Sequence, residues 1–115
     1  MRDRLNGLVL AGEKEATAGL WQQDYVDEAE TLDTIGERQV LVDGAGHPVA
    51  VVEIVRVETC RFVDVGWEFA CAEGEGFQSI EHWRDGHRDH YASQGTRIDD
   101  ADRVVCIWFR LASQP

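Results

Sequence analysis

The residues best suited to nucleophilic chemistry are Lys14 and Thr17, which lie three positions apart. Lys14 is the only lysine in the chain, and the other strongly basic residues are all arginines. A lysine acts as a base or a nucleophile only where burial or nearby charge lowers its pKa. A threonine hydroxyl needs such a base beside it to attack a carbonyl. The spacing also fits a surface lysine and a threonine in a turn, which is the simpler interpretation of these two residues alone.

Two carboxylates could complete such a site. Glu73 and Glu75 flank Gly74 in a glycine-rich segment between two expected helices. Glycines allow the backbone to bend tightly there and to bring a carboxylate close to a ligand. An exposed acidic loop is the alternative interpretation. Ser79 follows at the start of the next helix, where a serine commonly serves as N-cap.

The histidines do not form a recognisable metal motif. His82, His87 and His90 lack the H-E-x-x-H pattern and any pair spaced by four residues. His87 falls on the apolar stripe of its expected helix, so we expect a packed or hydrogen-bonded core histidine there rather than a ligand. No phosphate-binding loop, dinucleotide fingerprint or G-x-S-x-G sequence is present. We therefore expect neither a metal nor a cofactor.

Composition limits the function classes. The 115 residues suit a single domain, with 22 acidic residues against 11 lysines and arginines and a formal net charge of −11. Binding to polyanions is driven largely by counterion release, so this charge disfavours general nucleic-acid binding. A small neutral substrate would meet no such penalty. Without a long apolar run or a signal-peptide block, the sequence predicts a cytoplasmic protein with no membrane span, in which Cys60, Cys71 and Cys106 are buried free thiols.

Periodicity gives the elements that must position these residues. The patterns predict helices over 3–11, 64–72 and 79–93, and a helix or helical turn over 21–30. They also predict strands over 39–43, 49–59 and 103–111, and a loop or short strand over 13–18. Asp3, Asp64 and Ser79 are the expected N-caps. Apolar residues on both faces of the second strand suit a curled sheet or barrel. We expect a barrel interior formed by five residues: Val51, Val55, Val57, Ile107 and Phe109. Trp83 and His87 should be largely buried.

Two segments together resemble the ASCH family. Residues 12–17, Gly-Glu-Lys-Glu-Ala-Thr, are similar to its G-x-K-x-x-T signature. Residues 73–87 resemble the run E-G-E-G-x-x-S-x-x-x-W-x-x-x-H seen in many bacterial members, and the hairpin at 43–48 fits between them. This resemblance spans nearly the whole chain. It implies an α+β fold, namely a PUA-like small β-barrel with surrounding helices, over residues 1–115.

The resemblance also implies a function. Some small ASCH proteins are amidohydrolases that deacetylate N4-acetylated cytidine nucleosides, and their catalytic Lys, Thr and Glu match Lys14, Thr17 and Glu75, with Glu73 the other candidate for the glutamate. The expected substrate-binding residues are Ser79, Glu73, Arg84 and Trp21. The expected partner is accordingly a modified nucleoside. The alternative is an RNA-binding or single-stranded-RNA-cleaving domain that places Lys14, Arg84 and Arg88 on phosphates.

Overall fold

The computed structural model describes residues 2–113 of the chain. Its elements, in chain order, are α1 (Arg2–Leu10), β1 (Ala16–Leu20), the π-helical turn η1 (Trp21–Val26), β2 (Arg38–Val42), β3 (Pro48–Arg61), the 3₁₀ turn η2 (Phe62–Asp64), α2 (Trp67–Ala72), α3 (Ile80–Ser93) and β4 (Arg103–Ser113). No helix in this range is long and apolar enough to cross a membrane. The fold is α+β, as the sequence predicts.

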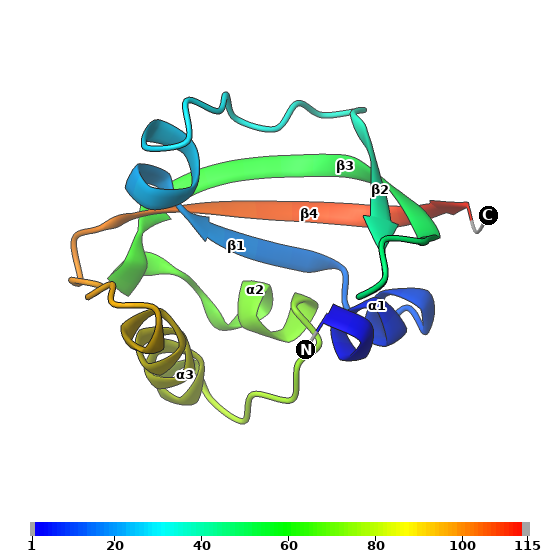
Figure 1. Cartoon of the computed structure of the whole chain (residues 1–115). Coiled ribbons are helices and arrows are strands. Elements are labelled where there is room, and N and C mark those ends of the chain that lie inside the picture. Colours follow the sequence, from blue (N-terminus) through cyan, green and yellow to red (C-terminus); the bar gives the residue numbers. More distant parts are fainter. Residues whose placement is uncertain (1, 114–115) are drawn as a thin grey trace.

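The strands form one antiparallel sheet in the order β1-β4-β3-β2. Figure 1 shows the long strands β3 and β4 side by side at its centre, with α2 and α3 beyond β1 and α1 near β2. The sheet curls into a half-barrel whose edges are β1 and β2. The predicted barrel-like fold takes the form of this curled half-barrel, in which β1 and β2 are the two edge strands.

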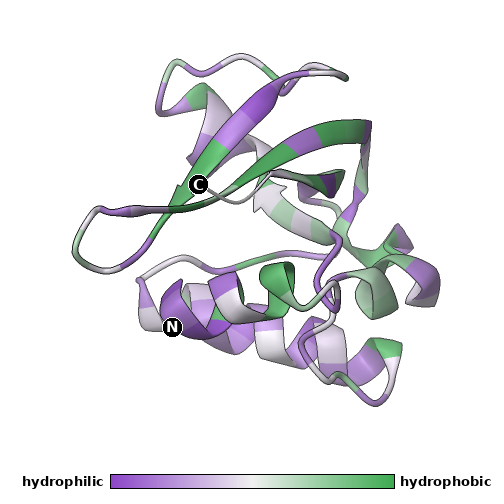
Figure 2. Ribbon diagram, turned by 90° about the vertical axis from the view of Figure 1, so that its right-hand side faces the viewer, coloured by the Kyte–Doolittle hydropathy of each residue, from purple (hydrophilic) through white to green (hydrophobic). Residues whose placement is uncertain are grey.

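Apolar cores lie on both faces of the sheet. On the face toward α2 and α3, Val104 and Cys106 of β4 join a cluster that includes Trp83 of α3. On the opposite face, Val105 and Ile107 join a second cluster. A strand buried on both faces carries a nearly continuous apolar run, as the stretch 104–109 of β4 does. In Figure 2 the sheet and the helices form two layers, and green hydrophobic stretches follow the long strands.

The expected barrel interior is wrong for two of its five residues. Ala50, Val52 and Ile54 of β3 are buried, whereas Val55 is 42% exposed and Val51 is only partly buried. The register shifts between Ile54 and Arg56, which is a β-bulge at Val55. One extra residue reverses the alternation of faces, so Val57 joins the same core cluster as Ile54. Ile107 and Phe109 are buried in this cluster, as predicted.

Of the expected N-caps, Ser79 is confirmed, whereas Asp3 lies inside the first turn of α1 and accepts a hydrogen bond from the Gly44 backbone N–H at 3.2 Å. Helix α3 begins after Ser79, whose Oγ accepts a hydrogen bond from the backbone N–H of His82 at 3.0 Å. Helix α1 ends before Gly12, which adopts a φ of 77°. The helix expected over 64–72 instead splits into η2 and α2, because Asp64 pairs with Arg61 at 2.7 Å and does not cap a helix.

The segment expected as a helix or helical turn over 21–30 forms the six-residue helical turn η1. Asp24 within it accepts a hydrogen bond from the Leu20 backbone N–H at 2.7 Å.

The burial of the three cysteines was predicted only in part. Cys106 is buried and Cys60 partly buried, but Cys71 is exposed on the short helix α2. All three are free thiols.

Candidate functional site

Lys14 is buried, with only 6% of its surface exposed. It follows α1 at the turn into β1, where its backbone N–H donates to the Leu8 carbonyl at 3.1 Å. The Nζ atom donates to the Ala16 carbonyl at 2.7 Å and to Glu75 Oε2 at 2.8 Å. It also lies 3.5 Å from Glu73 Oε2. A buried ammonium must be paired to be tolerated, and here it lies between two carboxylates.

Glu73 is the more deeply buried of the two carboxylates, with 2% exposure. It directly follows α2, and its Oε1 accepts a hydrogen bond from the indole Nε1 of Trp83 at 2.5 Å. Burial raises the pKa of Glu73 to about 7, although Lys14 and the Trp83 hydrogen bond act in the opposite direction. Glu73 can therefore exchange a proton near neutral pH, which is the range in which general acid–base catalysis is most effective.

The loop at Gly74 brings the two carboxylates to Lys14. The Glu15 backbone N–H donates to the Ala72 carbonyl at 2.7 Å, so this loop lies directly against the Lys14 segment. Gly74 has a φ of +65°, and a Cβ placed there would lie 1.8 Å from the Glu13 carbonyl oxygen. Only glycine permits this backbone approach. The glycine-rich segment thus brings Glu73 and Glu75 against Lys14.

His87 faces Glu73 from α3. Its Nδ1 lies 2.9 Å from the Trp83 carbonyl oxygen. A carbonyl can only accept, so Nδ1 carries the hydrogen and Nε2 of the neutral ring is left as an acceptor. Nε2 lies 3.5 Å from Glu73 Oε1. Burial lowers the pKa of His87, which favours the neutral ring.

These groups line a cavity of about 310 Å³ between β1, the 73–77 loop and α3. Its lining residues are Leu5, Lys14, Thr17, Ala18, Glu73, Glu75, Phe77, Gly86, His87, His90 and Tyr91. The three residues expected to be catalytic, Lys14, Thr17 and Glu75, thus meet in one cavity although 58 positions separate Thr17 from Glu75. Thr17 lies on the edge strand β1, and Lys14 Nζ has its hydrogen bonds with other groups.

The remaining expected substrate-binding residues lie elsewhere, except Glu73. Ser79 is occupied as the N-cap of α3. Arg84 donates to the Val63 carbonyl at 2.9 Å and so ties α3 to the turn after β3. Trp21 stacks on Tyr25 with ring centroids 6.1 Å apart. None of these three lines the cavity at Lys14.

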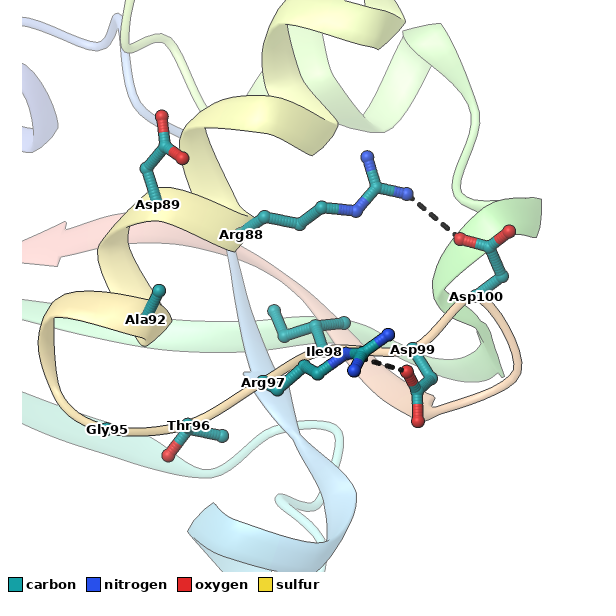
Figure 3. A pocket seen from close by; sticks show the side chains of 9 residues that line it. All are labelled: Arg88, Asp89, Ala92, Gly95, Thr96, Arg97, Ile98, Asp99 and Asp100. Atoms are coloured by element: carbon teal, nitrogen blue, oxygen red, sulfur yellow. Dashed lines mark hydrogen bonds and ion pairs between the residues drawn. The ribbon is translucent and has the colours of Figure 1, made fainter.

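A second polar groove, of about 720 Å³, lies at the end of α3 and in the loop before β4 (Figure 3). Its arginines are neutralised by neighbours, because Arg88 pairs with Asp100 at 2.9 Å and Arg97 with Asp99 at 3.5 Å. Arg88 is therefore not a free phosphate contact. Within residues 2–113, no group of three or more His, Cys, Asp or Glu side chains is arranged to hold a metal ion.

Sequence reasoning missed His87 and Tyr91 as cavity residues. The sequence places His87 on the apolar stripe of α3, and this stripe does pack against the core through the fully buried Trp83. This stripe of α3 extends beyond the core cluster, and its residues His87 and Tyr91 line the cavity at Lys14. One signal was available, since His87 lies four residues after Trp83 and so directly above it on the helix.

The comparisons agree with this architecture. The model of the ASCH domain family matches residues 1–113. The chain belongs to the ASCH domain family. An ASCH domain from Lactobacillus crispatus is 28% identical with a TM-score of 0.79, over 95% of this chain and 70% of that one. A protein from Enterococcus faecalis is 27% identical with a TM-score of 0.82, over 96% of this chain and 68% of that one.

A more distant structure, that of a hypothetical protein, supports the fold alone. It is 18% identical with a TM-score of 0.67, over 97% of this chain and 94% of that one. A search of the curated proteins found no match. This ASCH domain has the PUA-like fold that the two sequence segments predicted, and its signature residues Lys14 and Thr17 border the cavity described above.

Proposed function

We propose that this ASCH domain is an amidohydrolase that removes the acyl group from an N4-acylated cytidine-like nucleoside. One observation carries the proposal. The sole lysine of the chain is buried between two carboxylates and lines the same cavity as Thr17. Burying such a cluster is costly for a small domain unless it serves a purpose, and perturbed titratable groups in a cavity mark functional sites.

Thr17 is the nucleophile in this mechanism. Its hydroxyl oxygen bonds to the amide carbon, and its proton passes to Lys14 Nζ. Lys14 donates to its neighbours in the resting arrangement, so it must first release a proton to a carboxylate. The tetrahedral intermediate then breaks the C–N bond, and the cytosine amine leaves with a proton returned from this cluster. Water hydrolyses the resulting threonine ester, which releases the carboxylic acid and regenerates the hydroxyl.

The two carboxylates have different tasks. Glu75 is partly exposed and holds Lys14 Nζ at 2.8 Å, at the cavity that Thr17 also lines. Glu73 has a pKa of about 7, so it accepts the Lys14 proton and returns it within one reaction cycle. His87 Nε2 is on the far side of Glu73 and can share that proton. Glu73 is buried, which limits its contact with bulk water, whereas His87 is only partly buried.

The test is incubation of the full chain with N4-acetylcytidine, with the products separated and identified by mass. We expect cytidine and acetate from the parent protein. The variants K14A, T17A and E75Q should be inactive, whereas the matched controls T34A and E81Q, at exposed positions outside the cavity, should remain active. If the parent protein leaves N4-acetylcytidine intact while folded, the proposal is wrong for this substrate.

The RNA alternative has less physical support. The residues it would place on phosphates besides Lys14 are engaged, Arg84 with the Val63 carbonyl and Arg88 with Asp100. Ser79 is a helix cap. The net charge of −11 also opposes association with a polyanion. A small nucleoside, handled in the cytoplasm, fits these features better.

A further inference from the structure

A second cavity adjoins the candidate site, and its chemistry is different. It has a volume of about 460 Å³ and lies between α1 and the face of the sheet that carries Thr17. Seven apolar side chains line it, namely Leu5, Val9, Leu41, Val52, Ile54, Ile107 and Phe109, together with the polar residues Arg2, Asn6, Lys14, Thr17 and Gln39. No carboxylate is among these lining residues, although the chain as a whole is strongly acidic.

This cavity is larger than packing defects usually are. Interiors of small domains are close-packed, with few voids larger than a water molecule. Val9, Val52 and Ile54, at most 5% exposed, belong to the second core cluster yet line the cavity. Apolar cavities of several hundred cubic ångströms with a few polar groups at one end are typical of small-molecule sites. The chain thus leaves an apolar space in its own core.

The two cavities meet at the proposed reacting groups. Leu5, Lys14 and Thr17 line both of them. Because β1 is an edge strand, one cavity can extend on the α3 side of Thr17 and the other on the α1 side. An amide held at Thr17 would therefore project its nitrogen substituent into one cavity and its acyl substituent into the other.

The residues that line the two cavities indicate which of them suits the nucleobase of the substrate and which suits the acyl group. The cavity toward α3 presents polar and aromatic groups, including Phe77, His87 and Tyr91, which suit a nucleobase through stacking and hydrogen bonds. The cavity toward α1 presents mainly aliphatic side chains, which suit a hydrocarbon. An acetyl group would leave most of the 460 Å³ unfilled.

We infer that the apolar cavity toward α1 is an acyl-group site and that the substrates of this domain carry acyl chains longer than acetyl. The identity of the ligand rests on the proposed function. Each methylene buried should raise kcat/KM by up to about fourfold. Across N4-acetyl-, N4-butanoyl- and N4-hexanoylcytidine, the hexanoyl compound should be hydrolysed with at least about tenfold higher kcat/KM than the acetyl compound.

The cavity can be blocked at its rim. Leu41 is partly buried on β2 and lines it, and Val40, the preceding residue, is exposed on the opposite face. L41F should therefore abolish the preference for the hexanoyl chain. V40F is the matched control and should change neither this preference nor the turnover of the acetyl compound. Thermal melts of both variants establish whether they fold. If L41F does not fold, the double variant I107V/V52A, which enlarges the cavity, should shift the preferred substrate to one with a longer acyl chain.

A binding measurement separates this inference from the proposed function. In the full chain with labelled methyl groups, hexanamide should shift the NMR signals of Ile54 and Ile107, and acetamide should not. If no acylcytidine is hydrolysed but hexanamide shifts these signals and L41F prevents it, the acyl site stands and the amidohydrolase proposal fails. If acetylcytidine is hydrolysed with no gain from longer chains, or cytidine itself shifts these methyls, the inference is overturned.

Discussion

The indole Nε1 of Trp83 donates a hydrogen bond to Glu73 Oε1 at 2.5 Å, so the fully buried tryptophan of α3 holds the buried carboxylate of the candidate site. The ring of Trp83 also stacks on Phe62, with centroids 5.4 Å apart, and on His87 at 4.0 Å. The same side chain therefore packs the core, supports His87 and positions Glu73. Core packing and site geometry are coupled through it.

This coupling predicts different effects for two substitutions of Trp83. W83A should lower the free energy of unfolding by about 3–5 kcal/mol, as is typical for truncating a buried aromatic. W83F keeps most of the packing but removes the donor, so it should cost about 1–3 kcal/mol and raise the pKa of Glu73 above its present value. Denaturant unfolding and the pH profile of activity measure the two effects. Equal stability of W83F and the parent would show that the hydrogen bond contributes little.

Glu73 should make stability depend on pH. Its pKa is raised in the folded protein from 4.5 to about 7, so the folded state binds the proton more tightly than the unfolded chain. Stability from this group is present below pH 4.5 and is lost as the pH rises toward 7, by about 1–3 kcal/mol. His87 acts oppositely, since its lowered pKa makes protonation below 6.5 unfavourable in the folded state.

The contribution of Glu73 is isolated by comparing the parent protein with E73Q. The difference in unfolding free energy should change across pH 4.5–7 in the direction given above, while Lys14, Glu75 and His87, which face Glu73, remain in both proteins. Chemical denaturation at several pH values gives the difference. A pH-independent difference would mean that Glu73 titrates as an ordinary carboxylate.

Lys14 and Thr17 should behave as one catalytic unit. K14A and T17A should each abolish deacylation, and the double variant should be little worse than either, because a base and its nucleophile act together. T17S should keep part of the activity, since it retains a hydroxyl. Both single variants should fold, which circular dichroism can verify. Full activity of T17A would replace the covalent route by a water activated at Lys14 or Glu75.

Two glycines of one loop give a matched test of how the site is assembled. Gly74 and Gly76 both have positive φ, but only at Gly74 would a Cβ collide with the Glu13 carbonyl oxygen, whereas the space around Gly76 is open. G76A should cost about 1–2 kcal/mol from backbone strain alone. G74A should cost more, by a further 1–3 kcal/mol or so, and should reduce activity by displacing Glu75. Equal effects would contradict the close approach.

The sequence predicted those elements whose signals are local. Ser79 as a helix cap depends on neighbouring residues only, and this prediction is confirmed. The meeting of the Lys14 segment with the 73–75 loop came from a resemblance, since no local pattern joins residues so far apart. The face of β3 was predicted incorrectly because the bulge at Val55 depends on pairing with β4. Arg84 and Ser79 were expected at the substrate, but structural hydrogen bonds use both.

Trapping the covalent acyl intermediate tests most directly whether Thr17 is the nucleophile. The folded chain would be mixed with N4-acetylcytidine, quenched in acid within one turnover, and analysed by intact mass followed by peptide mapping. We expect a single acyl adduct on the peptide containing Thr17, absent from T17A and from K14A. Cytidine release at the full rate from T17A, or an adduct on a residue outside the cavity, would contradict it.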